Sequence, residues 1–267
     1  MPAAVLSPHL DDAILSCWHL LEGAGDVAVV NVFTGSPPPG TPAPPWDRLT
    51  GAQDPVVRMR ERRAEDRRAL AVVGRTAVDL GFLDAQYRTT EVSTGTLVTR
   101  LRVLLEPGTV LHAPAGLSGH PDHEIVRAAA LELARDGWPV TLYADLPHGI
   151  TRGWPEWVAC VAEAPGIHAG SDWAAVLAGS GLIVDRLVPR VRPLDALGRA
   201  RKLRALAEYG TQRAALDDLA FAPLADPRVL AFEVSWDLPR SALGSAHERV
   251  GEPFVADARG EPPHGGR

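Results

Sequence analysis

The sequence predicts an α/β fold in which helices cover both faces of a mostly parallel β-sheet. Three observations lead to this prediction. Short apolar runs alternate with longer helical patterns through the first half of the chain. Two of these apolar runs are followed by clusters of histidine and aspartate, where parallel sheets carry ligand-binding residues. With 267 residues, 46% of them hydrophobic, the chain is long enough to bury one large core.

The elements of the first half follow from these patterns in chain order. Runs rich in aliphatic residues predict strands at 3–6, 27–33, 76–82, 109–112 and 140–144. Helical periodicity predicts helices at 13–21, 56–73, 96–105 and 124–135. Repeated right-handed crossovers between parallel strands then give a Rossmann-like three-layer sandwich, which binds ligands beyond the C-terminal ends of its strands.

The pattern is weaker beyond residue 144. We expect a strand at 182–188 and a helix at 194–209, and little periodicity is left after Trp236. The chain is therefore expected to form one domain over residues 1–235, followed by an extension over 236–267 whose tail at 260–267 is disordered.

The segment 36–46 contains six prolines, which remove backbone donors and fix φ, so it is expected to lack regular secondary structure. It follows the second strand, at the same edge of the sheet as the polar clusters. We interpret it as the rim or lid of an active site, and a polyproline ligand for a partner module is the less favoured alternative. Trp46, at its end, could stack on a sugar ring or simply anchor the loop.

Composition argues against several classes of partner. A net charge of −6 and a pI of about 5.8 provide no basic surface for nucleic acid or anionic membranes. The two cysteines, Cys17 and Cys160, support neither a disulfide framework nor a cysteine zinc site, and we expect them to pack as small hydrophobes. The chain shows no signal sequence or apolar run of spanning length, and its high content of Ala, Arg, Gly and Pro is typical of GC-rich bacterial genomes. A cytoplasmic bacterial protein is therefore expected.

The first polar cluster, His9-Leu10-Asp11-Asp12, follows the strand expected at 3–6. An imidazole and two carboxylates at the mouth of a hydrophobic core are unfavourable unless a divalent cation compensates them. In an extended turn His9 and Asp12 can face the same side while Asp11 points elsewhere. One carboxylate would then bind a metal, and its neighbour would be left to act as a base.

The second cluster, Gly119-His120-Pro121-Asp122-His123, follows the strand expected at 109–112. The first and fourth strands are usual neighbours across the point where the strand order reverses, so we expect the two clusters to meet. His123 would then complete a metal-binding set with His9 and Asp12. Three ligands of mixed nitrogen and oxygen type suit zinc first, with iron(II) and cobalt as alternatives, and leave positions open for water and substrate.

Both clusters can also be interpreted as the starts of helices. Asp11 or Asp12 could cap the helix at 13–21, and Pro121 could open the helix at 124–135 with His123 on its surface. Helix capping does not predict that two clusters distant in sequence converge in space, whereas a shared metal does. The metal site is therefore the favoured interpretation.

Together these residues resemble the PIG-L/LmbE-like superfamily of zinc-dependent N-deacetylases. Further landmarks lie in family order over about residues 3–215: Arg62-x-x-Glu65, Leu80-Gly81-Phe82-Leu83-Asp84, Tyr143-Ala144-Asp145-Leu146-Pro147, and Lys202 through Tyr209 to Gln212. Two positions depart from the family pattern. Ala13 stands where many members carry glutamate, and Ser118 stands where some carry a tyrosine that assists at the oxyanion.

The resemblance implies three zinc ligands, which are His9, Asp12 and His123. It makes Asp11 the general base and His120 the group that polarises or protonates at the tetrahedral stage. Asp122 becomes the carboxylate that orients His120. We expect the His120 ring to be charged. Arg62 and Asp84 are expected to bind sugar hydroxyls or a phosphate group of the substrate.

The leading hypothesis is therefore a metal-dependent amide hydrolase that removes an N-acetyl group from a small amino-sugar glycoside, in secondary-metabolite or thiol-cofactor assembly. A phosphoesterase that holds Mg²⁺ on paired aspartates is one alternative, and the two imidazoles argue against it. A catalytically silent binding relative is another, and the intact base position argues against it. The expected partner is a small amino-sugar substrate, bound with help from His148 unless that residue is an ordinary surface histidine. The sequence leaves a homo-oligomer open.

Overall fold

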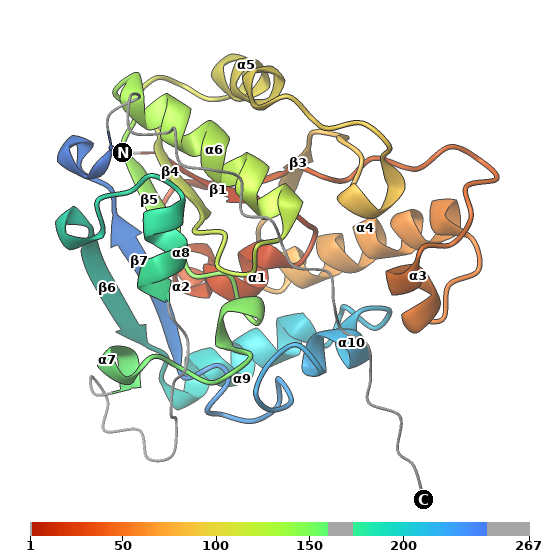
Figure 1. Ribbon diagram of the computed structural model, residues 1–267. Coiled ribbons are helices and arrows are strands. Elements are labelled where there is room, and N and C mark those ends of the chain that lie inside the picture. The colour runs from red at the N-terminus through yellow and green to blue at the C-terminus, as the bar shows by residue number, and fades with distance from the viewer. Residues whose placement is uncertain (1, 160–172, 245–267) are drawn as a thin grey trace, which may run out of the picture.

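A seven-stranded β-sheet runs through the computed structural model of the protein, which describes residues 2–159 and 173–244 (Figure 1). The strand order is β3-β2-β1-β4-β5-β7-β6. Five strands are parallel: β1 (Ala3–Ser7), β2 (Val27–Asn31), β3 (Ala77–Asp79), β4 (Val110–Pro114) and β5 (Val140–Tyr143). Two more extend the sheet in antiparallel pairing: β7 (Phe232–Asp237) beside β5, and β6 (Val188–Pro193) at the edge. This confirms the predicted α/β class and the mostly parallel sheet.

Helices cover both faces of the sheet, so it forms the middle of three layers (Figure 1). One layer holds α5 (Thr94–Leu104) packed on α6 (Pro121–Arg135). The other holds α1 (Asp12–Ser16), α2 (Trp18–Glu22), α4 (Pro55–Ala71) and α9 (Ala196–Leu206). Shorter helices lie in the connections: α3 (Pro45–Leu49), α7 (Glu156–Ala159), α8 (Trp173–Gly179) and α10 (Arg213–Asp217). The 3₁₀ turns are η1 (Ala85–Tyr87), η2 (His148–Ile150), η4 (Val184–Arg186) and η5 (Arg240–Ala242).

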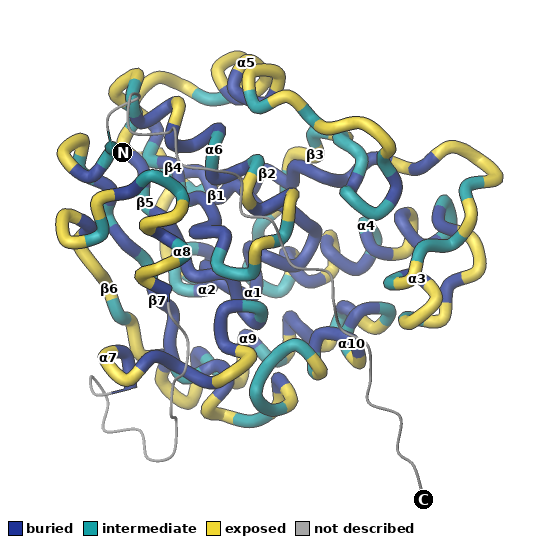
Figure 2. Tube along the Cα trace, viewed as in Figure 1, coloured by how far each residue is buried: buried dark blue, intermediate teal, exposed yellow. Residues whose placement is uncertain are grey.

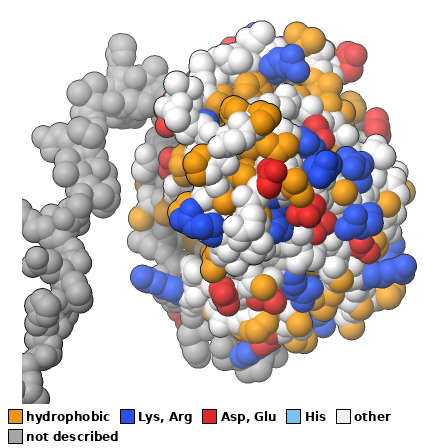
Figure 3. Space-filling view, turned by 90° about the vertical axis from the view of Figure 1, so that its right-hand side faces the viewer, with side chains coloured by type: hydrophobic (Ala, Val, Ile, Leu, Met, Phe, Trp, Pro, Cys, Tyr) orange, Lys and Arg blue, Asp and Glu red, His pale blue; other side chains and the backbone are white. Residues whose placement is uncertain are grey.

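The middle strands of the sheet are buried, while exposed residues gather on the outer helices and loops (Figure 2). Ala4, Val5 and Leu6 of β1 have no exposed surface. Such a strand reads as a continuous apolar run because helices cover both of its faces. On the side that carries α3 and α4, positive, negative and hydrophobic side chains are interspersed, so this face has no large field of one sign (Figure 3). Among the described residues, the helices are too short or too polar to cross a bilayer.

The helix predicted over 13–21 is in fact two helices, because the chain leaves helical geometry at Cys17, with φ −131° and ψ 28°. The free amides that start α2 are capped from a distant strand. Glu233 of β7 accepts hydrogen bonds from the backbone N–H of Trp18 at 2.7 Å and of His19 at 2.9 Å. The buried ammonium of Lys202 in α9 donates to the same carboxylate at 2.8 Å. The prediction of one unbroken helix was therefore wrong, since the cap that divides it lies far away in sequence.

A second correction concerns the strand predicted over 182–188. Residues 184–186 form η4 instead, and the strand β6 follows at Val188–Pro193. Pro189 and Pro193 are tolerated there because β6 is an edge strand with one side of its backbone unpaired. β7 was not predicted at all.

Within the proline-rich segment, α3 starts at Pro45, with proline in the first turn where no amide donor is needed. Cys17 is buried as expected; Cys160 and the tail at 260–267 lie outside the described residues.

The Glu233–Lys202 pair leads to a prediction about stability. Burial by itself raises the pKa of Glu233, but the charges of Lys202 and His19 lower it to about 2, so the carboxylate is charged at neutral pH. Lys202→Met removes the ammonium that faces this buried charge and leaves only His19 and two backbone N–H groups beside it. We expect the free energy of unfolding to fall by about 3–5 kcal/mol, measured by urea denaturation followed by circular dichroism.

The control for this experiment is Arg190→Met, which breaks the exposed ion pair between Arg190 of β6 and Asp237 of β7. Because water screens that pair, we expect a loss below about 1 kcal/mol. A loss for Lys202→Met as small as that of the control would contradict the role given to the buried pair.

Candidate metal centre and active site

The two polar clusters meet where β1 and β4 end. These strands are parallel neighbours, with Ala3 opposite Val110 and Val5 opposite His112, so their C-terminal ends reach the same edge of the sheet. β2 and β3 lie on the far side of β1, and β5 lies beyond β4, so the strand order reverses between the two strands. The chain after β1 and the start of α6 therefore emerge side by side. The two clusters thus converge at the C-terminal strand ends, as expected from the sequence, and the metal expected there stays a prediction.

Three donor atoms from the two clusters form a tight triangle. His9 Nδ1 lies 3.5 Å from Asp12 Oδ2 and 3.3 Å from His123 Nε2, and the last two atoms lie 3.3 Å apart. Ligands at 2.0–2.1 Å from a tetrahedral zinc ion are separated by about 3.3 Å. The residues present therefore fit a divalent metal. The structure also brings together the donor atoms of two related groups, His9 with His120 and His123, and His9 with Asp84 and Asp122, each within 4.8 Å.

Each of the two imidazoles has a carboxylate on its other nitrogen. His9 Nε2 lies 3.0 Å from Asp122 Oδ2. His123 Nδ1 lies 3.4 Å from Asp145 Oδ1, which is an ion-pair distance without hydrogen-bond geometry. Asp145 is fully buried, and its other oxygen accepts from the backbone N–H of Leu117. Carboxylates behind histidine ligands fix the ring orientation and strengthen metal binding. The role of Asp145 was missed in the sequence, although it stands in the segment 143–147 that resembles the family.

The electrostatics of the triangle favour a cation. Burial alone would lower the pKa of both histidines, but the surrounding carboxylates outweigh it. Hydrogen bonds to Asp12 and Asp122 raise the pKa of His9 well above its ordinary value, and Asp12 and Asp145 raise that of His123 to about 9. Burial would raise the pKa of Asp12, but the two imidazoles hold it well below its usual range. A divalent cation at the triangle would replace these protons.

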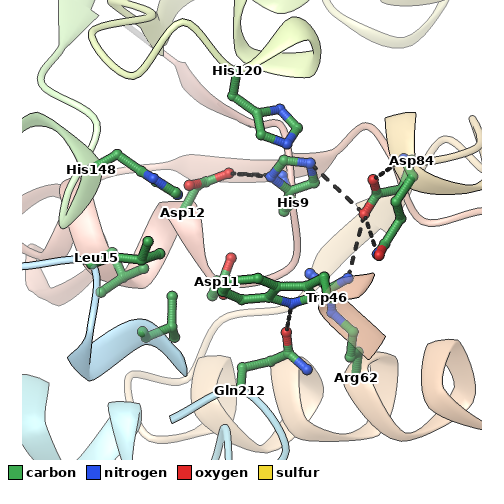
Figure 4. Close-up of a pocket in the computed structure, with 13 residues that line it drawn as sticks. His9, Asp11, Asp12, Leu15, Trp46, Arg62, Asp84, His120, His148 and Gln212 are labelled. Atoms are coloured by element: carbon green, nitrogen blue, oxygen red, sulfur yellow. Dashed lines mark hydrogen bonds and ion pairs between the residues drawn. The ribbon is translucent and has the colours of Figure 1, made fainter. Parts of the chain in front are cut away.

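Asp11 lies beside the triangle, as predicted, and lines the cavity that His9 and Asp12 also line (Figure 4). Its side chain is 7% exposed and makes no hydrogen bond to any of the residues described here. Burial and the charge of Asp12 raise the pKa of Asp11, and Arg62 and His9 oppose the shift. Asp11 and Asp12 are thus neighbours in sequence with different environments.

His120 and Asp122 are arranged differently from the prediction. His120 caps α6, and its Nδ1 accepts the backbone N–H of Asp122 at 3.2 Å. The Asp122 carboxylate points the other way, to His9, to the guanidinium of Arg88 and to the backbone N–H of Ala85 at 3.0 Å. The expected pairing of Asp122 with the His120 ring was therefore wrong.

The expected charge on His120 is wrong as well. Burial and the neighbouring His9 and His123 lower its pKa to about 4, so the ring is neutral at pH 7. The physical reason for the changed pairing is the helix start, where the cap residue turns its side chain back over the first amides. Arg88, which the structure places against the carboxylate of Asp122, stands in no sequence pattern that points to the site.

The predicted substrate-binding residues line the same cavity, which has a volume of about 150 Å³. Arg62 Nη1 lies 3.4 Å from Asp84 Oδ2, and His148 lies on the opposite side with its ring centroid 6.0 Å from that of His123 (Figure 4). Burial and His123 lower the pKa of His148 to about 4. Trp46, for which stacking on a sugar ring was one of two expectations, also lines the cavity. The remaining lining residues were not predicted as site residues: Leu15, Gln86, Gln212, Leu216 and Leu219. The cavity therefore has a polar wall at Arg62 and Asp84 and an apolar wall formed by leucines.

The comparisons with known proteins agree with this geometry. The family described as PIG-L, GlcNAc-PI de-N-acetylase, matches residues 4–134. The solved structure of A40926 pseudoaglycone deacetylase Dbv21 is 30% identical to this chain, with a TM-score of 0.61 over 90% of this chain and 97% of that one. The chain belongs to the PIG-L family.

Two further relatives of this PIG-L protein were found. A 2′-N-acetylparomamine deacetylase from Streptomyces fradiae is 34% identical in an alignment of 183 positions that covers 61% of this chain and 63% of that relative. The chain thus matches somewhat under two thirds of that enzyme's length. The zinc-inhibited form of teicoplanin deacetylase Orf2 has a TM-score of 0.64 at 23% identity over 88% of this chain and 97% of that one, which supports the fold alone.

The carboxylate behind His123 leads to a prediction about metal affinity. Asp145→Asn keeps the size of the side chain but removes the charge that faces His123 Nδ1. We expect the affinity for zinc, used as the probe ion, to fall about 10- to 100-fold, measured by competition with a chromophoric chelator. Asp237→Asn, on the exposed end of β7, is the matched control and should leave affinity unchanged. Equal affinities for the two variants would show that Asp145 does not support the site.

Proposed function

We propose that this PIG-L protein is a zinc-dependent hydrolase that removes an N-acetyl group from an amino-sugar-containing small glycoside in secondary-metabolite assembly. The observation that carries the proposal is the triangle of His9, Asp12 and His123 donor atoms, 3.3–3.5 Å apart, with the uncommitted carboxylate of Asp11 beside it. Two of the relatives, a 2′-N-acetylparomamine deacetylase and an A40926 pseudoaglycone deacetylase, support the choice of reaction and of substrate class.

In this proposal His9, Asp12 and His123 hold the metal, and Asp122 and Asp145 keep the two imidazoles in position. When bound, zinc supplies a Lewis acid that lowers the pKa of water and polarises the amide carbonyl. Asp122 therefore supports the ligand His9, whereas the sequence had suggested that it orients His120. Its charge is stabilised by His9, Ala85 and Arg88, which together hold its pKa at about 2 against the opposing effect of burial.

Asp11 is the proposed general base. Its carboxylate is in the cavity without a hydrogen-bond partner among the described residues, so it can accept the proton of the attacking water and deliver it to the departing amine. Its raised pKa, caused by burial and Asp12, brings it closer to the range in which proton transfer to and from a carboxylate is efficient at neutral pH.

His120 is the proposed hydrogen-bond donor to the oxygen of the reacting amide. Because Nδ1 accepts the Asp122 N–H, the neutral ring carries its hydrogen on Nε2. A neutral imidazole N–H can stabilise the developing negative charge on that oxygen without being an ion itself. Arg62, Asp84 and His148 are proposed to bind the sugar, since all three line the cavity around the triangle.

The test of the proposal is acetate release from N-acetylglucosaminides and N-acetylated aminoglycoside fragments. We expect the purified protein to release acetate and a free amine, to lose activity with a chelator, and to regain it with zinc. Release of phosphate from phosphate esters instead, or binding of these glycosides without turnover in the zinc-loaded protein, would contradict the proposal.

The separate roles of the ligands and the base lead to a further prediction. Asp11→Ala should retain one equivalent of zinc and lose at least about 100-fold in kcat, because it removes proton transfer and leaves the ligands in place. His123→Ala should lose the metal. Metal content measured by mass spectrometry, together with the acetate assay, separates the two variants. If both lost zinc equally, Asp11 would be a ligand and its assignment as the base would be wrong.

A further inference from the structure

Trp46 lies across the cavity on a helix that is separate from the metal-binding clusters. It belongs to α3, and its indole lies between Asp11 and Arg62 at the front of the site (Figure 4). Its Nε1–H donates to Gln212 Oε1 at 2.8 Å. Gln212 precedes α10, so this bond joins the two sides of the cavity opening. The ring is partly exposed, and it faces the cavity that holds the proposed reacting groups.

Other contacts already anchor the loop that carries Trp46. Asp47, the next residue, is fully buried and accepts the Tyr87 hydroxyl at 2.8 Å. The Arg58 guanidinium donates to the Thr50 carbonyl at 2.7 Å. At the other end of the proline-rich segment, Arg63 donates to the carbonyl of Thr34 and the hydroxyl of Ser36 at 2.7 and 2.9 Å. Anchoring the loop therefore does not require the indole, which leaves its position over the cavity to be explained.

Polar atoms without partners lie around the same part of the cavity. Gln86 Oε1 is buried and has no hydrogen-bond partner among the described residues, although its amide nitrogen donates to Asp84 Oδ2 at 3.1 Å. Arg62 Nε is likewise buried without a partner in the described chain. Buried polar atoms of this kind are costly unless a ligand satisfies them. An acceptor and a donor beside an aromatic face match a pyranose ring, which has C–H groups on its faces and hydroxyls at its edge.

We propose that Trp46 is a specificity-determining residue whose indole face stacks on the pyranose ring of the substrate, with Gln86 and Arg62 as the polar groups at its edge. This inference rests on the proposed function for the choice of a sugar amide as the substrate. It adds that the enzyme recognises the ring itself, so cyclic amino sugars are selected over acyclic N-acetyl amides. Asp47 and Tyr87 act as positioning residues that hold α3 over the cavity.

Trp46→Ala tests the stacking face, and Trp46→Phe tests the hydrogen bond to Gln212. For a methyl N-acetylglucosaminide we expect Trp46→Ala to raise KM about 5- to 50-fold, and Trp46→Phe to raise it less than about threefold, since an aromatic face remains. For N-acetylethanolamine, an acyclic amide with a hydroxyl group, kcat/KM should change less than about twofold in either variant. Trp157→Ala, a partly exposed tryptophan on α7 outside this cavity, is the matched control and should behave as the parent.

Equal losses of kcat/KM on the cyclic and acyclic substrates would overturn the inference, because Trp46 would then only shape the loop. Losses for Trp46→Phe as large as those for Trp46→Ala would also overturn it, in favour of the Gln212 bond. Calorimetric binding of the amine product, methyl glucosaminide, keeps the inference separate from the proposed function. If binding depends on Trp46 but no acetate is released, the proposed function fails and the stacking stands. If acetate is released and neither KM nor product binding depends on Trp46, the stacking fails alone.

Discussion

The protein holds imidazoles and carboxylates beside the apolar core of its sheet, and this is stable only because each group contacts one of opposite charge or polarity. Removing any of them from water is costly unless it is paired. Asp12 lies between His9 and His123, and Asp122 and Asp145 lie behind these two rings. The geometry of the loop after β1, the start of α6 and the chain after β5 therefore depends on one shared set of contacts. Loss of one partner would leave the others buried without compensation.

The same set of contacts gives two of three aspartates lowered pKa values and the third a raised one. Asp12 is held charged by two imidazoles, and Asp122 by His9, Ala85 and Arg88, so both have lowered pKa values. Asp11 lacks such partners, and burial beside Asp12 raises its pKa. When the environment pushes the pKa values of like groups apart, one group can have a structural role and another a chemical one. The adjacency of Asp11 and Asp12 thus places a proposed base next to a proposed ligand. The indole of Trp46 lies in front of them and lines the same cavity.

Much of this architecture can be predicted from the sequence, because the rules that create it are local or topological. Apolar runs of strand length, helical periodicity and the reversal of strand order were enough to predict the sheet and the meeting of the two clusters. The features that were missed depend on distant residues. The break at Cys17 follows from Glu233, more than 200 residues away, and the orientation of Asp122 follows from Arg88 and Ala85, which show no pattern. β6 carries prolines that only an edge position tolerates.

The most direct test of the account is a crystal structure of the zinc-loaded protein with anomalous diffraction at the zinc edge. The account predicts one zinc ion bound by His9 Nδ1, Asp12 Oδ2 and His123 Nε2, with the carboxylate of Asp11 near the ion but not coordinated to it. Zinc bound instead by the alternative set of His9, Asp84 and Asp122, or by Asp11 in place of Asp12, would contradict the proposed division between ligands and base.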